Sequence, residues 1–273
     1  MQPAVQNQTF TTPDGCAIAY ALRGTTKPKA PRLALIHSLA LDASIWDNVV
    51  AELSNDAQIL TYDCRGHGRS GKPHMAFSAD LFARDLAELL DRVGWQSAVV
   101  AGCSMGGCVA LAFGGLFPAR ASALGLIDTT AWYGADAPKN WRERAANARA
   151  KGLSGLVEFQ TTRWFGDQFR NHHPESVKPL VDVFLANDLN CYAATCEMLG
   201  DADLRPYLNS LRMPVAIVVG EEDYATPVAA SQHLHEAIPQ STLTIISGGR
   251  HLTPVERPGE IAAQLRALFQ RVA

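Results

Sequence analysis

Apolar and polar positions alternate between two patterns along most of this chain. Continuous apolar runs predict strands that are buried on both faces of a sheet, at residues 33–36, 98–101, 123–127 and 215–219. Two more strands are predicted at 58–62 and 242–246, and the turn Pro13-Asp14-Gly15 predicts a hairpin between 8–12 and 16–22. Helical spacing of apolar positions predicts helices at 43–53, 79–93, 229–237 and 258–272. This order predicts an α/β fold whose mostly parallel central sheet carries helices on both faces.

The alternation stops between about residues 130 and 208. This stretch has no convincing apolar strand, and its spacing predicts short amphipathic helices at 141–151, 153–165, 175–186 and 191–199. We therefore expect residues 1–129 and 209–273 to form one α/β core. Residues 130–208 are expected to form a helical cap inserted into that core.

Composition narrows the class of protein. The chain has 273 residues, 47% of them hydrophobic and 19% charged, which fits one large folded domain with an insertion. The net charge is −3 and no basic run occurs, so nucleic acid and anionic membranes are not expected partners. The start of the chain has no signal-peptide pattern, and no apolar run is long enough to span a bilayer. Six scattered cysteines without paired CxxC spacing indicate reduced thiols and no metal site, so we expect a cytoplasmic protein without a cofactor.

The chemistry is expected to centre on Ser104. An apolar strand runs directly into Gly102-Cys103-Ser104-Met105-Gly106, and a helical run of small residues follows. This context is typical of a nucleophile elbow, in which the serine occupies a strained turn at the C-terminal end of a strand. Gly102 and Gly106 fit such a turn because strand and helix pass closely there.

A serine hydroxyl needs a base and an acid that orients the base. His251 follows the predicted strand 242–246, and Asp223 follows the strand 215–219, so both lie where the strand ends meet. We assign Asp223 as the orienting acid and His251 as the base. The rival acids are Asp128, which also ends a strand, and the adjacent pair Glu221 and Glu222.

An oxyanion intermediate needs two hydrogen-bond donors. One is expected to be the backbone N–H of Met105, and the other the N–H of Leu39, with that of Ser38 as the alternative. His37 ends a core strand, so we expect it to brace this loop rather than transfer protons. The remaining histidines lack a strand-end position and are expected on the surface or in loops, at positions 67, 74, 172, 173, 233 and 235.

Together these motifs resemble the α/β-hydrolase superfamily over essentially the whole chain. The resemblance rests on His37-Ser38-Leu39, Asp63-x-Arg65-Gly66-His67-Gly68-x-Ser70, Gly102-x-Ser104-x-Gly106-Gly107, Gly220-x-x-Asp223 and Gly249-x-His251. Within the superfamily the chain looks most like the 3-oxoadipate enol-lactonases of bacterial aromatic catabolism (the β-ketoadipate pathway). Stretches that carry this closer resemblance include Arg163-Trp164-Phe165 and Asp201-Ala202-Asp203-Leu204-Arg205. Cys103 and Arg250 depart from the pattern.

The resemblance implies hydrolysis of an enol lactone with a carboxylate arm, through an acyl group on Ser104. A carboxylate needs a cation, and the cap offers Arg142, Arg144 and Arg163 as candidates. The candidate walls of the pocket are Ser38 and the cap tryptophans Trp132, Trp141 and Trp164.

Three other functions remain open at this stage. One is a carboxylesterase or perhydrolase with the same three site residues, and another is a hydrolase of carbon–carbon bonds in aromatic degradation. The third is a ligand-binding receptor built on this fold. In each case the partner is a small molecule, and the sequence leaves the oligomeric state open.

Overall fold

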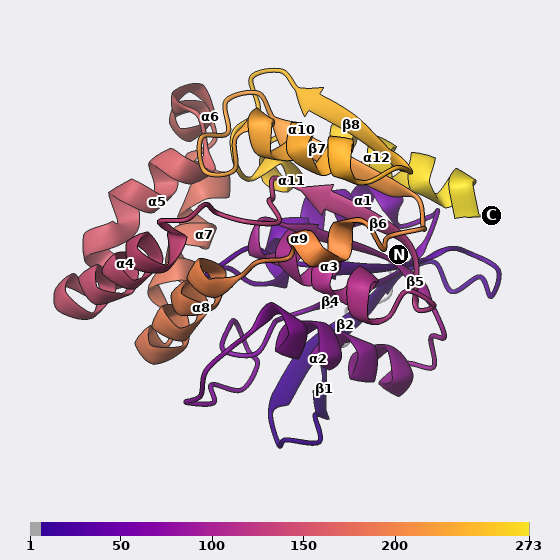
Figure 1. Ribbon diagram of the computed structural model, residues 1–273, viewed down its shortest axis with the longest axis horizontal. Coiled ribbons are helices and arrows are strands. Elements are labelled where there is room, and N and C mark those ends of the chain that lie inside the picture. The colour runs from indigo at the N-terminus through magenta and orange to yellow at the C-terminus, as the bar shows by residue number, and fades with distance from the viewer. Residues whose placement is uncertain (1–6, 273) are drawn as a thin grey trace.

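Eight strands form one sheet in the computed structural model, which describes residues 7–272 (Figure 1). The order across the sheet is β1-β2-β4-β3-β5-β6-β7-β8. The hairpin β1–β2 and the pair β2–β4 are antiparallel, and every other neighbouring pair is parallel. The strands are β1 Asn7–Thr11, β2 Ala17–Gly24, β3 Arg32–Ile36, β4 Gln58–Tyr62, β5 Ala98–Cys103, β6 Ala121–Ile127, β7 Val215–Gly220 and β8 Ser241–Ile246.

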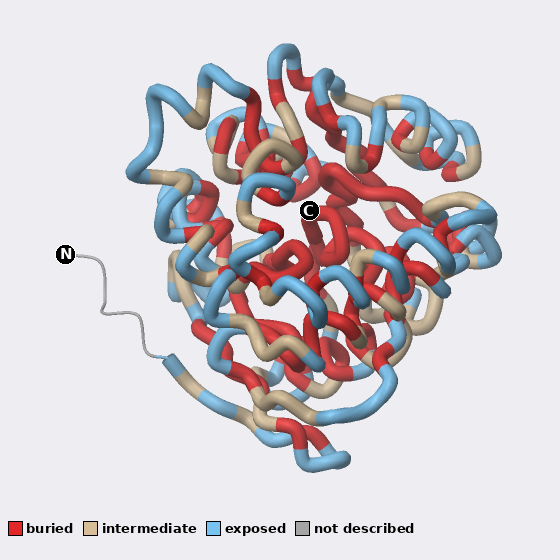
Figure 2. The backbone as a smooth tube through the Cα atoms, turned by 90° about the vertical axis from the view of Figure 1, so that its left-hand side faces the viewer, coloured by how far each residue is buried: buried red, intermediate tan, exposed pale blue. Residues whose placement is uncertain are grey.

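Burial along the strands matches the apolar pattern of the sequence. Every residue of β5 and β7 is buried, because helices cover both faces of these central strands. The edge strand β1 alternates between exposed and half-buried residues instead. Figure 2 shows the buried segments gathered in the middle of the molecule, with exposed loops and helix surfaces around them. The predicted α/β fold with a mostly parallel sheet is therefore confirmed.

Helices of the core lie on both sides of the sheet (Figure 1). α2 packs on α3, which covers β5 and β6, while α1 packs on α12, which covers β6 and β7. These helices are η1 Ala43–Trp46, α1 Asp47–Leu53, α2 Ala79–Arg92, α3 Met105–Leu116, α10 Val228–Ala237, α11 Thr253–Glu256 and α12 Pro258–Val272. The helix predicted at 43–53 is split, because Asp42 accepts the Ser44 N–H and caps a short 3-10 turn before α1 begins.

Only helices are found between β6 and β7, apart from a single β-bridge between Trp132 and Asp203. The helices are α4 Ala137–Lys151, η2 Leu153–Leu156, α5 Val157–Trp164, α6 Asp167–His172, α7 Pro174–Leu185, α8 Leu189–Asp201 and α9 Arg205–Leu208. Figure 1 shows α4 to α8 beside one end of the sheet, while α9 packs on α3 of the core. We keep 130–208 as the proposed extent of the cap. The short helices α6, α9 and α11 were not predicted, because four to six residues carry too little periodicity.

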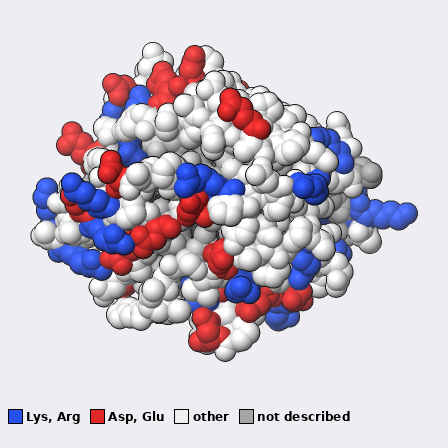
Figure 3. All heavy atoms as spheres, in the orientation of Figure 1, with Lys and Arg blue, Asp and Glu red and all other residues white. Residues whose placement is uncertain are grey.

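Charged side chains of both signs are intermixed on the face seen in Figure 3, many of them over the cap helices. Among residues 7–272, no helix is both long and apolar enough to cross a lipid bilayer.

Candidate active site

Ser104 occupies the sharp turn between β5 and α3. Its backbone has φ 56° and ψ −114°, a conformation that costs free energy for a residue with a Cβ atom. A Cβ atom on Gly102 would overlap the carbonyl of Gly106, and one on Gly106 would overlap the carbonyl of Ile36. The two glycines therefore allow strand β5, helix α3 and the end of β3 to meet closely, as the motif predicts. The candidate nucleophile is held at the C-terminal edge of the sheet.

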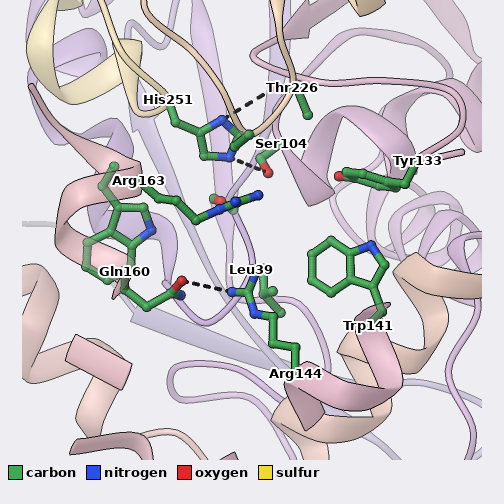
Figure 4. A pocket seen from close by; sticks show the side chains of 12 residues that line it. Leu39, Ser104, Tyr133, Trp141, Arg144, Gln160, Arg163, Thr226 and His251 are labelled. Carbon is green, nitrogen blue, oxygen red and sulfur yellow. Dashed lines mark hydrogen bonds between the residues drawn. The ribbon is translucent and has the colours of Figure 1, made fainter. Parts of the chain in front are cut away.

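The structure brings together the three residues that the sequence paired across long distances. The Nε2 atom of His251 lies 2.9 Å from the Oγ atom of Ser104, as Figure 4 shows. The Nδ1 atom of His251 lies 2.8 Å from the Oδ2 atom of Asp223. Because a carboxylate only accepts, Nδ1 carries the imidazole proton and Nε2 is free to accept the serine proton. This geometry is suited to a nucleophile, a base and an orienting acid.

Neighbouring donors keep Asp223 in its charged form. The backbone N–H groups of Ala225 and Thr226 donate to its Oδ1 atom at 2.7 and 3.0 Å, and the Thr226 hydroxyl donates to Oδ2 at 2.8 Å. Burial acts to raise the pKa of Asp223, but the interactions with His251 and Thr226 outweigh it and lower this pKa. An ionised carboxylate is the partner that an imidazolium needs during acyl transfer.

The rival acids have other partners. Glu221 accepts hydrogen bonds from Ser247 and from a backbone N–H, and Glu222 faces Arg250 at 3.2 Å. Asp128 is fully buried with φ 47°, and its carboxylate accepts hydrogen bonds from the N–H of Gly220 and from the N–H and hydroxyl of Thr253. Burial and the nearby charge of Asp223 raise the pKa of Asp128 well above its usual value. It therefore joins the ends of β6 and β7 to α11 rather than meeting the imidazole.

His37 braces the loop that carries the expected second oxyanion donor. The Cys64 N–H donates to its Nε2 atom at 2.9 Å, so its Nδ1 carries the proton and donates to the Ser38 carbonyl at 2.7 Å. That carbonyl and the Leu39 N–H share one trans peptide and point in opposite directions. Neither the Leu39 N–H nor the Met105 N–H donates to another backbone group of residues 7–272. Both amides are thus available to a ligand at Ser104.

A narrow pocket opens in front of Ser104, between the sheet edge and the cap. Among the described residues, no aspartate or glutamate lines it. The lining consists of Ser38, Leu39, Ser104, Tyr133, Trp141, Arg144, Gln160, Arg163, Trp164, Ala225, Thr226 and His251.

Two arginines of the cap enter this pocket (Figure 4). Arg144 donates to the Tyr192 hydroxyl at 2.8 Å and to the Gln160 side-chain oxygen at 2.9 Å, and its guanidinium lies 4.8 Å from the Trp141 ring centre. Arg163 lies between two aromatic rings, 5.4 Å from that of Phe159 and 5.6 Å from that of Tyr224. Burial, reinforced by the charge of Arg144, lowers the pKa of Arg163.

Neither guanidinium has a carboxylate within ion-pairing distance in residues 7–272. A partly buried cation without a counter-ion, such as Arg163, is stabilised when a ligand supplies the negative charge. Burial acts to lower the pKa of Arg144 as well, but its contacts with Tyr192 and other neighbours outweigh burial and raise that pKa. The pocket is therefore electrostatically suited to an anionic ligand.

Two predicted pocket residues lie elsewhere. The side chain of Arg142 is 57% exposed and pairs with Asp201 at 2.9 Å, outside the pocket. One residue along a helix turns the side chain by about 100°, so Arg142 cannot share the inward face of Trp141, whereas Arg144 one turn later does. Trp132 is 38% exposed at the base of the cap and lies under the guanidinium of Arg205. The expectation that Arg142 and Trp132 line the pocket is therefore not met in this structure.

Sequence reasoning also missed or misplaced several residues. Gln160 is on the same face of α5 as Arg163 and Trp164, three and four positions later, and this spacing could have identified it. Thr226 and Tyr133 lie on loops, where no periodicity marks them. His67 was expected at the surface or in a loop, and it lies in a loop but is fully buried.

Comparisons with known proteins identify the family of this chain. Residues 31–258 match a family described as alpha/beta hydrolase fold. The chain is 33% identical to 3-oxoadipate enol-lactonase 2 of Acinetobacter baylyi over 253 residues, which cover 92% of this chain and 94% of that protein. The crystal structure of an enol-lactonase from Burkholderia xenovorans aligns with a TM-score of 0.91 at 28% identity, covering 96% of this chain and 100% of the other. A malate-bound esterase from Thermogutta terrifontis aligns with a TM-score of 0.90 at 27% identity, covering 98% and 99%.

Proposed function

Because this chain belongs to the alpha/beta-hydrolase fold family, we propose that it is a serine-dependent hydrolase of an enol lactone that carries a carboxylate arm. The proposed reaction is that of its enol-lactonase relatives, the conversion of 3-oxoadipate enol-lactone to 3-oxoadipate. The observation that carries this proposal is that Ser104 shares its pocket with two cap arginines, Arg144 and Arg163, that have no carboxylate partner. A general esterase of neutral substrates has no use for two such cations. The malate of the similar Thermogutta esterase is likewise a small dicarboxylate.

The site residues supply each step. Ser104 Oγ attacks the lactone carbonyl carbon as its proton passes to His251 Nε2, and the N–H groups of Leu39 and Met105 hold the oxyanion. Collapse of this intermediate breaks the bond between the carbonyl carbon and the ring oxygen, which receives the proton from His251 as an enol. The enol becomes a ketone within the acyl group on Ser104. Water then attacks the acyl carbon and gives its proton to His251, which returns one to Ser104 Oγ as the keto diacid is released.

Asp223 acts through His251 in this scheme. Its carboxylate fixes the imidazole with the proton on Nδ1 and stabilises the imidazolium that forms when Ser104 is deprotonated. Trp141 and Trp164 wall the pocket beside the arginines, and Ser38 adjoins the oxyanion site. No step in this scheme requires a cofactor.

A matched pair of substrates tests the anionic preference. Mono-(4-nitrophenyl) succinate and 4-nitrophenyl butyrate share a leaving group and similar size, and they differ in one carboxylate. Replacing Arg144 or Arg163 by Met removes a charge-assisted contact, so kcat/KM for the succinate should fall about tenfold or more. The butyrate should be hydrolysed nearly as before. Arg142→Met is the control, because that side chain points away from the pocket.

Three results would contradict the proposal. Appreciable hydrolysis by Ser104→Ala would remove Ser104 as the nucleophile. Unchanged succinate hydrolysis in both Arg144→Met and Arg163→Met would remove the carboxylate clamp and favour a general carboxylesterase. Equal losses on both substrates would mean that the arginines only hold the cap together. The enol lactone itself, assayed with the same variants, should follow the succinate.

A further inference from the structure

Tyr133 is a polar side chain of the pocket that faces Ser104 and has no role in the reaction described above. It lies between β6 and α4 and lines the same pocket as Ser104 and His251. Its ring packs edge-on against Trp141, with 5.3 Å between the ring centres and 78° between the planes. Figure 4 shows its hydroxyl pointing from the wall of the pocket toward the space in front of Ser104. The aromatic packing fixes where this hydroxyl lies.

The Tyr133 hydroxyl has no good acceptor among residues 7–272. Its one polar contact is the sulfur of Cys108, at 4.0 Å, which is the outer limit for a bond to sulfur. The thiol of Cys108 itself donates to the Thr130 carbonyl at 3.3 Å. This part-buried O–H points into the pocket without a good protein acceptor, so the pocket offers an unused donor to a ligand.

This hydroxyl is suited to donate a hydrogen bond and unsuited to give up its proton. Burial, with the nearby thiol of Cys108, raises the pKa of Tyr133 well above its usual value, and the charges of Arg163 and Arg144 only partly oppose this. The phenol therefore stays protonated at neutral pH. Proton transfer to the leaving oxygen is left to His251.

We propose that Tyr133 is a specificity-determining residue whose hydroxyl donates to a carboxylate oxygen of the substrate, beside Arg144 and Arg163. The inference rests on the proposed function, because it assumes that the two arginines meet a substrate carboxylate. A carboxylate offers about four lone-pair positions and so can accept from two guanidinium groups and one hydroxyl together. The scissile carbonyl is a poorer target, because the free N–H groups of Leu39 and Met105 already serve it.

The variant Tyr133→Phe tests this role, because it removes the hydroxyl and keeps the ring on Trp141. With mono-(4-nitrophenyl) succinate, kcat/KM should fall about tenfold, mainly through a higher KM, because the contact to the carboxylate is present before and during the reaction. With 4-nitrophenyl butyrate, kcat/KM should stay within about twofold. Tyr207→Phe is the control, since its hydroxyl meets Asp80 at 3.1 Å outside this pocket.

The outcomes separate this inference from the function on which it rests. If Arg144→Met loses the preference for the succinate and Tyr133→Phe keeps it, the role of Tyr133 is refuted and the proposed function stands. If Tyr133→Phe loses activity equally on both substrates, the hydroxyl supports the structure or the chemical step and the proposal is also overturned. If Arg144→Met and Arg163→Met leave the preference for the succinate unchanged, the proposed carboxylate clamp of the two arginines fails first, and the carboxylate contact of Tyr133 beside them fails with it.

Discussion

Replacing His67 should change how the stability of this protein depends on pH. His67 is fully buried in the loop after β4, 5.1 Å from the ring of His37 and edge-on to Phe82. Its Nδ1 atom lies 3.0 Å from the Arg65 carbonyl and therefore carries the proton, while its Nε2 atom has no partner in residues 7–272. Burial, reinforced by His37, lowers the pKa of His67 to about 3.

The size of the effect follows from this pKa. In the unfolded chain the imidazole takes up a proton near its ordinary pKa of about 6.5. Between that value and about 3, the unfolded state binds a proton that the folded state does not bind. The free energy of unfolding therefore falls as the pH is lowered through this window, by about 1.4 kcal/mol per pH unit. From about pH 7.5 to about pH 4.5, His67 alone should account for a loss of about 3 kcal/mol.

Urea unfolding of His67→Phe across this pH range measures the effect. Phe fills the site and cannot bind a proton, and the lost hydrogen bond to the Arg65 carbonyl should lower stability by a similar amount at every pH. The variant should therefore lose less stability than the natural chain as the pH falls, with the two curves converging by about 3 kcal/mol. His74→Phe, at an exposed position in the same region, should leave the pH dependence almost unchanged. Parallel curves for His67→Phe and the natural chain would refute the reasoning.

Two further changes test the charged groups. Asp223→Asn should lower kcat by about 10⁴ with little change in stability, because the amide holds the imidazole in the wrong tautomer; a mild loss would move the acid's role elsewhere. Asp85→Asn should lower the free energy of unfolding in urea by about 1–3 kcal/mol, because Asp85 is the buried partner of the Arg65 guanidinium, which keeps its second ion pair with Asp14. The double change Asp85→Leu with Arg65→Met should lower stability by less than the sum of the two single changes Asp85→Leu and Arg65→Met. A loss equal to that sum would contradict this explanation.

The strands and most core helices could be predicted because their determinants are local. A continuous apolar run such as 215–219 forms a strand that must be buried on both faces of a sheet. This can be read from the run itself, without knowing the rest of the chain. The same is true of Gly102 in the turn at Ser104, where a Cβ atom would overlap the Gly106 carbonyl four residues on, whereas Gly106 is required by the neighbouring strand at Ile36. The short helices α6 and α11 were not predicted from the sequence, because contacts with neighbouring segments, rather than apolar periodicity, hold them in place.

The contacts made by individual side chains of the cap could not be predicted from the sequence. Its helices could be recognised, and so could the presence of tryptophan and arginine within them. The choice among Arg142, Arg144 and Arg163 depended on which face of α4 and α5 turns toward Ser104, and the notably polar sequence of α4 does not reveal this. Arg142 and Trp132 were assigned to the pocket on residue type alone, and their actual neighbours are Asp201 and Arg205.

The sequence alone therefore determined the α/β architecture, the turn that carries Ser104 and the strand ends from which an acid and a base must come. The sequence also favoured Asp223 over Asp128 as this acid, and the structure places Asp223 against His251. Only the tertiary structure decided that Arg144 and Tyr133 face Ser104. The reason is physical: backbone propensities and apolar spacing act within a few residues. The contacts of the site join groups as far as 147 residues apart along the chain, and only the packing of the sheet and the cap brings them together.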